Sequence, residues 1–457
     1  MRWARLALAL GLLSPAAGAA QDTLPLPLAA RQRPWLAVAE AIGVNLFVNR
    51  FDAWATGQAW AHVSPSSWRQ NLRLGWEWDE NEFGTNLFAH PYHGGLYFNA
   101  GRANGLDFWE SAPLAFLGSW SWEYLGERFR PSLNDFFMTS VGGIALGESF
   151  HRVGASIRDN QARGGGRILR EVAALPLDPM GSLNRLVRGE WTAVGQNPPE
   201  HDPDGFALRL AGGVQVTQDT FSTDRDIESA TLVADLLYRD PITQPYQAPF
   251  DVFGVRAQVS AHGALHLLRA SGRLYGANLN GTARRHRHLF EVNQRFDYSR
   301  NPAQEFGGQS VEAGIYSRWR LSEHSGLRTQ FFADAIILGA MDATVAGTGL
   351  RGYDFGPGLG LRTELAFERK GVTWLRSWAR SELLHSVSGA PADHEASFGG
   401  FEAVVPLPYR FGIGLHTGYF RRVSRYPGKV KEKRDFTEAR LFLSWTAVGS
   451  NALVGAP

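Results

Sequence analysis

Apolar and polar residues alternate with a period of two along the second half of the chain, from about residue 206 onward. In one segment, apolar side chains share one parity: Phe290, Val292, Phe296 and Tyr298. Polar side chains occupy the other parity: Glu291, Asn293, Arg295 and Asp297. Because successive side chains of a strand point to opposite faces, the pattern predicts β-strands with one apolar face and one charged face.

The apolar face of these strands could contact lipid or a protein core. Three features favour lipid: the segments are long, the polar face is crowded with Arg, Glu and Asp, and aromatic residues such as Phe250 and Tyr419 gather near strand ends. Roughly twelve segments fit between residues 205 and 450, and bacterial barrels have even strand numbers. We expect an antiparallel transmembrane β-barrel; the alternative is a soluble β-sandwich or lipocalin-like barrel.

The first half has a period closer to that of a helix. An apolar segment follows Pro34 directly, and a second helix is expected at residues 133–157 with Ser132 as its N-cap. Gly143 and Gly147 in that helix would let another backbone approach closely. Most of the 15 Trp residues lie in this half. Their rings suit a helical domain at a membrane surface or in a barrel's mouth.

The chain begins like an exported protein. Arg2 and Arg5 precede a short apolar run, and small residues around Ala19 fit a cleavage site. The sequence contains no Cys, so it offers neither disulfides nor thiolate metal ligands. Its net charge is +2, and the absence of a basic stripe argues against a nucleic-acid partner.

Together these patterns predict an α+β protein of the outer membrane. A cleaved signal peptide is expected to direct its export. The expected parts are a signal peptide at 1–20, an extended leader at 21–34, a helical domain at 35–195 and an outer-membrane β-barrel of about twelve strands at 205–450. The expected partner is outer-membrane lipid, and a small molecule or a lipid is considered as a ligand. No cofactor is indicated.

Residues with chemical potential concentrate between positions 89 and 148. The candidates for catalysis are His90, His93, Glu123, Glu127 and Asp135, and those for ligand binding are Arg102, Asn104 and Glu148. A helix over 119–130 would place Glu123 and Glu127 on one face. Pro91 predicts an irregular turn around the two histidines. The glycines at 164–166 and the following Arg167 predict a solvated loop.

These candidates support more than one interpretation. Histidine and carboxylate groups could ligate a divalent metal or act as general base and acid. They could equally bond to one another in a polar interior, with Arg102 pairing to Glu110 or Glu123, and Asn134 and Asp135 capping a helix. The sequence lacks the HExxH and GxSxG motifs that would indicate a metalloprotease or a serine hydrolase.

The order of several short motifs resembles one bacterial family of envelope proteins. The motifs include Asn86, His90-Pro91-Tyr92-His93-Gly94, Arg102, Asn104-Gly105, Trp122-Glu123, Pro131-Ser132-Leu133-Asn134-Asp135, Gly142-Gly143, Gly147-Glu148, Asp178-Pro179 and Asn184-Arg185-Leu186. The family is catalogued as domain of unknown function 3943. The resemblance covers about residues 70 to 190 and implies no particular activity.

Two main functions remain open from the sequence, and a soluble periplasmic binding protein is a third option. The first is a non-enzymatic outer-membrane protein whose helical domain plugs or caps the barrel, with a role in transport or envelope integrity. The alternative is an envelope enzyme, a hydrolase of lipid or glycan, that uses the histidine and carboxylate residues. The first is the one we favour, because no catalytic signature accompanies the candidates.

Overall fold

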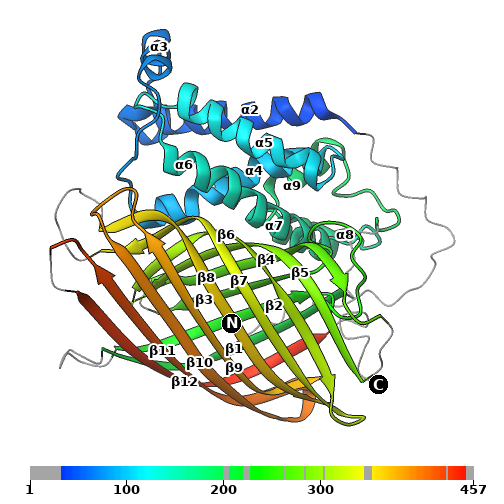
Figure 1. Cartoon of the computed structure of the whole chain (residues 1–457). Helices are drawn as coiled ribbons and strands as arrows, with labels where there is room; N and C mark the ends of the chain where they lie inside the picture. Colours follow the sequence, from blue (N-terminus) through cyan, green and yellow to red (C-terminus); the bar gives the residue numbers. More distant parts are fainter. Residues whose placement is uncertain are drawn as a thin grey trace. The chain divides into compact units, whose positions relative to one another are not determined.

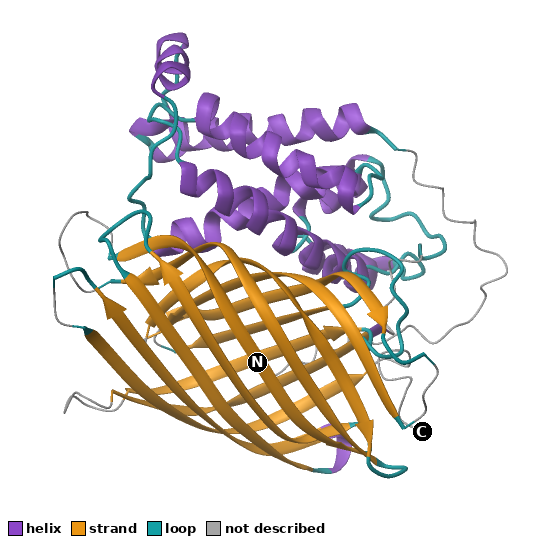
Figure 2. Cartoon of the chain, in the orientation of Figure 1, coloured by secondary structure: helices purple, strands orange, loops and turns teal. Residues whose placement is uncertain are grey.

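The structure is a computed structural model that describes residues 32–198, 205–219, 227–261, 263–281, 285–301, 304–343, 352–428 and 431–448. The chain divides into two compact units (Figures 1 and 2). The helical unit comprises Met1–Asp79 and Phe88–Asp204, and the barrel unit comprises Glu80–Leu87 and Gly205–Pro457. The expected signal peptide at 1–20 and residues 21–31 of the expected leader lie outside the described residues.

The barrel unit is a closed antiparallel barrel of twelve strands, as the period-two pattern predicts. Consecutive strands pair with one another, and β1 pairs with β12 to close the ring. Closure removes the open edges that a flat sheet would leave. The strands are β1 (Phe206–Asp219), β2 (Ile227–Tyr238), β3 (Phe253–Ser260), β4 (Gly263–Asn278), β5 (His286–Asn301), β6 (Gln304–Arg320), β7 (Ser325–Asp342), β8 (Tyr353–Arg369), β9 (Val372–His385), β10 (Asp393–Pro406), β11 (Phe411–Arg425) and β12 (Glu432–Val448).

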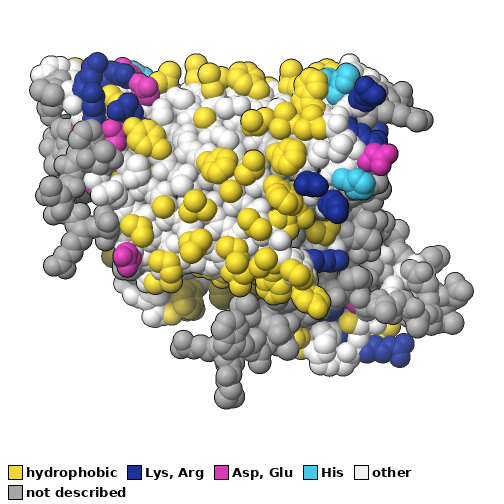
Figure 3. Space-filling model, turned by 90° about the horizontal axis from the view of Figure 1, so that it is seen from below, with side chains coloured by type: hydrophobic (Ala, Val, Ile, Leu, Met, Phe, Trp, Pro, Cys, Tyr) yellow, Lys and Arg dark blue, Asp and Glu magenta, His cyan; other side chains and the backbone are white. Residues whose placement is uncertain are grey.

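Charged side chains point into the lumen of the barrel and apolar ones point outward. In β8, Arg362 and Glu364 take part in ion pairs with other strands, whereas Leu361 and Leu365 on the opposite face are exposed. Figure 3 shows apolar side chains over the middle of one face, with charged residues nearer its margins. The predicted assignment of the two strand faces is therefore confirmed for β8.

Ion pairs bridge the lumen between strands that are not neighbours. Arg380 of β9 donates to both carboxylate oxygens of Asp297 in β5, at 3.1 and 3.1 Å. Arg295 of β5 lies 3.5 Å from Glu382 of β9. Arg295 also contacts two further carboxylates, at 3.2 and 3.1 Å. All six residues of this waist cluster are buried: Arg295, Asp297, Glu312, Asp334, Arg380 and Glu382.

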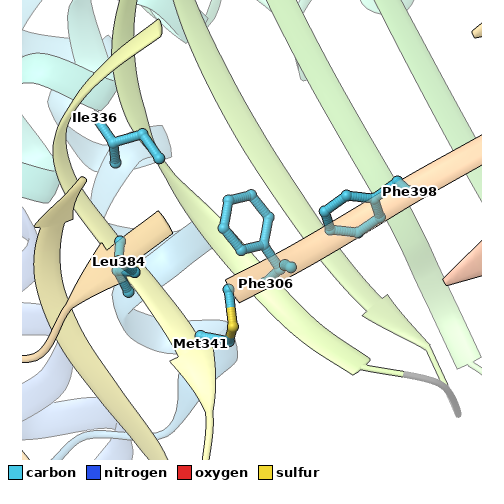
Figure 4. Packing of buried hydrophobic residues seen from close by; sticks show 6 residues of the cluster. Phe306, Ile336, Met341, Leu384 and Phe398 are labelled. Atoms are coloured by element: carbon cyan, nitrogen blue, oxygen red, sulfur yellow. The ribbon is translucent and has the colours of Figure 1, made fainter. Parts of the chain in front are cut away.

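An apolar cluster lies beside the waist cluster inside the lumen (Figure 4). Its buried members come from β6, β7, β9 and β10: Phe306, Ile336, Met341, Leu384, Ala396 and Phe398. The guanidinium carbon of Arg380 lies 5.0 Å from the ring centroid of Phe306 and 5.6 Å from that of Phe398. Side chains of the wall itself therefore occupy part of the lumen at this level.

The short segment Glu80–Leu87 packs against the outer face of the barrel wall. The Phe83 ring lies 5.7 Å from Tyr298 of β5 and 5.4 Å from Tyr353 of β8, between ring centroids. The Asn86 amide donates a hydrogen bond to the Tyr353 hydroxyl at 2.8 Å. Both tyrosines have the outward parity of their strands. The segment thus covers outer-wall side chains that would otherwise be exposed.

Short helices joined by π-helical turns build the helical unit. The helices are α2 (Pro34–Phe51), α3 (Pro65–Leu74), α4 (His90–Ala103), α5 (Phe108–Ser121), α6 (Leu133–Phe137), α7 (Gly143–Ile157), α8 (Gly164–Ala174) and α9 (Pro179–Val187). π-Helical turns are η2 (Asp52–Thr56), η4 (Thr85–Ala89), η5 (Trp122–Gly126) and η6 (Met138–Gly142). No helix among the described residues is long and apolar enough to cross a membrane.

Helices α4 and α7 approach each other through glycines. A Cβ atom on Gly94 would lie 1.7 Å from the carbonyl oxygen of Thr139, and one on Gly143 would lie 2.6 Å from the Gly94 Cα. A Cβ on Gly147 would lie 3.0 Å from the Gly95 Cα. The backbones are therefore in contact, which confirms the close approach expected from Gly143 and Gly147.

Three local expectations are corrected. Pro91 does not break the chain's helix: it stands in the first turn of α4, where its missing N–H is tolerated. The expected helix at 119–130 ends in the π-helical turn η5, and Glu127 after it is extended. The glycines at 164–166 open helix α8, and Arg167 is buried rather than solvated, because four groups of the chain accept its hydrogen bonds.

Gly94→Ala should destabilise the helical unit, because its methyl group would overlap the Thr139 carbonyl. Overpacking of this kind costs about 1–3 kcal/mol. The matched control is Gly43→Ala in α2, where nothing lies within 4 Å of the new Cβ. That change should stabilise the helix by about 0.5–1 kcal/mol. Urea unfolding followed by near-ultraviolet circular dichroism would compare them, and equal effects would contradict the backbone contact.

Candidate functional site: a buried histidine and carboxylate cluster

The sequence candidates for chemistry do come together in the helical unit. His90 and His93 lie in the first turn of α4, Glu123 lies in η5, Glu127 follows η5, and Asp135 lies in α6. His90 Nε2 is 3.5 Å from Asp135 Oδ2, and Glu123 and Glu127 are close enough to influence each other's ionisation. We call these five residues the His–carboxylate cluster.

The carboxylates of the cluster are held by local backbone and side-chain donors. Ser132 caps α6 by accepting from the backbone of Asp135, as expected from the sequence. The Ser132 backbone N–H in turn donates to Glu123 Oε2 at 2.7 Å. Trp122 Nε1 donates to Glu127 Oε1 at 2.7 Å. Asn134 is predicted to cap a helix. Instead, its side-chain amide donates a hydrogen bond to Asp135 Oδ1 at 2.9 Å.

His93 belongs to a chain of hydrogen bonds that fixes its protonation. Tyr97 donates its hydroxyl proton to Asn45 Oδ1. The same hydroxyl lies 3.0 Å from His93 Nε2. Because a tyrosine hydroxyl has one proton, Nε2 of His93 must be the donor in this second bond. The hydrogen bonds therefore place a proton on Nε2 of His93.

Burial shifts the pKa of both histidines and both glutamates of the cluster toward their uncharged forms. It lowers the pKa of His93 to about 3 and also lowers the pKa of His90. It raises the pKa of Glu127 to about 7, with the neighbouring Asp135 adding to the effect. Burial and the adjacent Glu127 raise the pKa of Glu123 well above its usual range. Near neutral pH these shifts favour a protonated Glu123, a partly protonated Glu127 and uncharged histidines.

This geometry is closer to a polar packing core than to a metal centre. Among the residues that the structure describes, no group of three or more His, Asp or Glu side chains is arranged to hold a metal ion. Within the same part of the chain, one oxygen of the cluster, Glu123 Oε1, is buried without a hydrogen-bond partner. Protonation of Glu123 removes the negative charge that its buried carboxylate would otherwise have to share with a partner.

The candidate binding residues form hydrogen bonds with other side chains of the helical unit. Arg102 does not pair with Glu110 or Glu123: its Nε donates to Glu148 Oε2 at 2.9 Å, because it extends from α4 toward α7. Arg152 donates to the other oxygen of Glu148 at 2.7 Å. These two cations hold the pKa of Glu148 below its usual value against the effect of burial. Asn104 donates to Glu40 Oε2 at 2.8 Å.

Sequence reasoning missed a second buried network around Asp178. Arg158 Nη1 lies 2.8 Å from Asp178 Oδ2, and His151 Nδ1 lies 3.1 Å from the same oxygen. Although burial opposes it, Arg158 and His151 hold the pKa of Asp178 well below its usual range. Asp178 also caps α9 by accepting from the backbone of Gly181. The Asp-Pro pair before that helix was the one sequence signal that marked the position.

Fold and site together define a closed antiparallel barrel joined to a helical unit with a self-satisfied polar core. The comparison with protein families confirms the resemblance: the model described as Domain of unknown function (DUF3943) matches residues 75–180. This segment runs from the end of α3 through α4, α5, α6, α7 and α8 to the start of α9. No curated protein matches the sequence.

Several solved structures are similar to the chain over the barrel. They include Acinetobacter baumannii OccAB4 (10% identity, 53% of this chain and 97% of that chain, TM-score 0.21). They also include the KdgM porin (6% identity, 51% and 98%, TM-score 0.22) and OmpT of Vibrio cholerae (7% identity, 52% and 98%, TM-score 0.19). The fold assignment itself rests on the strand pairing of this chain.

The contribution of Glu127 to the stability of the helical unit should fall as pH rises from 4.5 to about 7, while His93, whose pKa burial lowers to about 3, contributes with the opposite sign. In this window Glu127 is ionised in the unfolded chain, where its pKa is ordinary (4.5), but protonated in the folded chain, where it is about 7. The unfolded state then binds fewer protons, so the loss reaches on the order of 3 kcal/mol above the window.

Glu127→Gln should remove this share of the pH dependence, because the amide cannot ionise. The matched control, Glu190→Gln, changes a half-exposed carboxylate paired with Arg185 and should keep the slope. Urea unfolding at pH 5 and pH 8 measures the difference. An unchanged slope in Glu127→Gln would contradict the protonated state of this residue.

Proposed function

We propose that this chain is an integral outer-membrane β-barrel protein of a Gram-negative envelope, exported by the signal peptide expected at residues 1–20. The single observation that carries the proposal is the inverted polarity of the barrel. Soluble proteins bury apolar side chains and expose charge, and an outer-membrane barrel reverses this arrangement on its wall.

Large apolar side chains are exposed on the outward face of the wall across most strands. They include Val214, Leu232, Val259, Ile315, Phe331, Leu359, Leu361, Leu365, Leu375, Leu383, Phe401, Val405, Ile413, Leu415, Leu441 and Leu443. Leaving a side chain of this size in water rather than an apolar medium costs about 1.5–3 kcal/mol. A surface of this extent therefore favours acyl chains as its surroundings.

The partly obstructed lumen favours a role in envelope integrity over passive diffusion. The waist cluster bridges β5 and β9, and the apolar cluster of Figure 4 lies directly beside it. Glu312 and Glu382 are fully buried within the wall's own ion pairs. A wide aqueous channel would instead leave such side chains accessible to water.

The envelope-enzyme alternative is not favoured by a specific observation. The His–carboxylate cluster is buried, its histidines are neutral, and most of its polar atoms are bonded to neighbouring groups. A general base must reach the proton that it removes, and the burial of these residues works against this.

The full chain, expressed in a Gram-negative host, should fractionate with the outer membrane and resist carbonate extraction. The folded barrel should also migrate faster than the heated one in a denaturing gel, because a closed ring of paired strands resists unfolding by detergent. Recovery in the soluble periplasmic fraction would overturn the proposal.

A pair of outward substitutions sharpens this experiment. Leu361→Arg, at the middle of β8, should destabilise the barrel in lipid by about 2–4 kcal/mol. Val372→Arg, at the first residue of β9 beside a tight turn, should cost about 0–1 kcal/mol. Urea titration in lipid vesicles measures both, and equal small costs would argue for a soluble barrel.

In planar bilayers the wild-type protein should conduct little, because the waist cluster and the apolar cluster obstruct part of the lumen. Removing a charge of each sign with Asp297→Ala and Arg380→Ala should raise the single-channel conductance. The control pair Arg421→Ala and Asp435→Ala removes an ion pair of β11 and β12 that lies away from the waist. Wide, steady wild-type channels would contradict this obstruction.

A further inference from the structure

Helix α2 is built with its small and polar residues inside and its large apolar residues outside. Its buried positions recur every four residues: Ala37, Ala41, Asn45 and Asn49. Its exposed positions are large and apolar: Trp35, Leu36, Ile42, Leu46, Phe47 and Phe51. At 100° per residue the exposed positions cover roughly half of the helix circumference. A helix on the surface of a soluble protein has the opposite pattern.

The buried asparagines of α2 hold the unit together through hydrogen bonds. Asn45 Nδ2 donates to the Gly118 carbonyl at 2.9 Å and to Ser121 Oγ at 2.8 Å. Asn49 Nδ2 donates to the carbonyls of Ala61 and Gly126, both at 2.8 Å. Amide side chains that join helices through backbone carbonyls are typical of packing within lipid, where water cannot satisfy these groups.

Helix α5 repeats the inverted pattern. Its buried face contains the small residues Ser111, Ala115, Gly118 and Ser119, together with Phe108 and Leu114. Its exposed face contains Trp109, Phe116, Leu117 and Trp120. Glu110 at its first turn is the one charged residue of this helix. The glycine contact between α4 and α7 follows the same rule, since small residues allow helix backbones to meet in a membrane.

From these patterns we propose that the helical unit is immersed in lipid, with the exposed faces of α2 and α5 against acyl chains. This inference rests on the proposed outer-membrane function. None of the described helices is both long and apolar enough to span a bilayer, so we place the unit within the membrane but not across it. Helix α2 is about 27 Å long at 1.5 Å per residue, which suits a helix lying along the membrane plane.

Charge and aromatic placement favour lipid over a second protein as the occupant. Charged residues stand near the two ends of α2, at Arg33 and Arg50. Glu40 between them is half-buried, and its carboxylate accepts hydrogen bonds from Asn104 and Asn184. Arg50 lies over the Trp54 ring, 5.7 Å from its centroid. Arg beside Trp at the end of an apolar helix is typical of a membrane interface. A protein interface would normally carry a polar rim around its apolar centre.

The absence of Cys from the chain allows a direct test on the full-length protein. Single cysteines would be introduced as Leu46→Cys on α2 and Phe116→Cys on α5, and labelled with a nitroxide in vesicles of phosphatidylcholine and phosphatidylglycerol. Leu361→Cys on the outer face of β8 is the lipid benchmark. Arg163→Cys, which replaces an exposed residue before α8, is the aqueous benchmark. Collision rates with oxygen, which enters lipid, are compared with those of a water-soluble nickel chelate.

Labels at Leu46 and Phe116 are expected to give the high oxygen-to-nickel ratio of Leu361, several-fold above that of Arg163. Ratios equal to that of Arg163 would overturn the inference, because the faces would then meet water. Low accessibility to both reagents would also overturn it, because another protein surface or a second copy would then cover these faces. If the Leu361 label itself reports water, the barrel proposal fails; if it reports lipid while the others do not, only this inference fails.

Discussion

Backbone hydrogen bonding in a medium without water is the constraint on which the barrel depends. Every N–H and C=O group of a strand needs a partner there, and a sheet satisfies this need only when its first and last strands pair. Pairing of β1 with β12 supplies that closure. Closure then assigns each side chain to one of two environments. Leu361 and Leu441 face outward, while charged residues at alternate positions of the strands face the lumen. Inside the lumen these charges must neutralise one another.

Neutralisation inside the lumen has a structural consequence. Arg295 and Arg380 each contact carboxylates on distant strands, so the pairs tie opposite stretches of wall together as well as balancing charge. Charged groups removed from water need partners with good geometry, and unpaired ones would cost several kcal/mol. The same pairs occupy the space that a channel would require. Rigidity of the wall and obstruction of the lumen thus have one physical cause.

The helical unit obeys a related rule on a smaller scale. Its interior contains asparagine, serine, glycine and carboxyl groups beside apolar residues such as Phe98 and Leu146, and its surface carries tryptophan and leucine. The His–carboxylate cluster is one part of that interior. Its proton distribution follows from burial, which raises the pKa of Glu127 to about 7 and lowers that of His93 to about 3, so that the uncharged forms of both are favoured. Groups that resemble a catalytic set in the sequence therefore act together as a packed polar core.

The sequence by itself determined the features that depend on local spacing. The period-two pattern specified the strands and their faces, Pro34 and Ser132 marked helix starts, and Gly143 marked a close backbone approach. Only the tertiary structure decided which distant groups meet. Arg102 pairs with Glu148, and the segment Glu80–Leu87 packs on the outer wall, because long-range contacts depend on register and helix packing. Spacing along one chain carries no information about those distances.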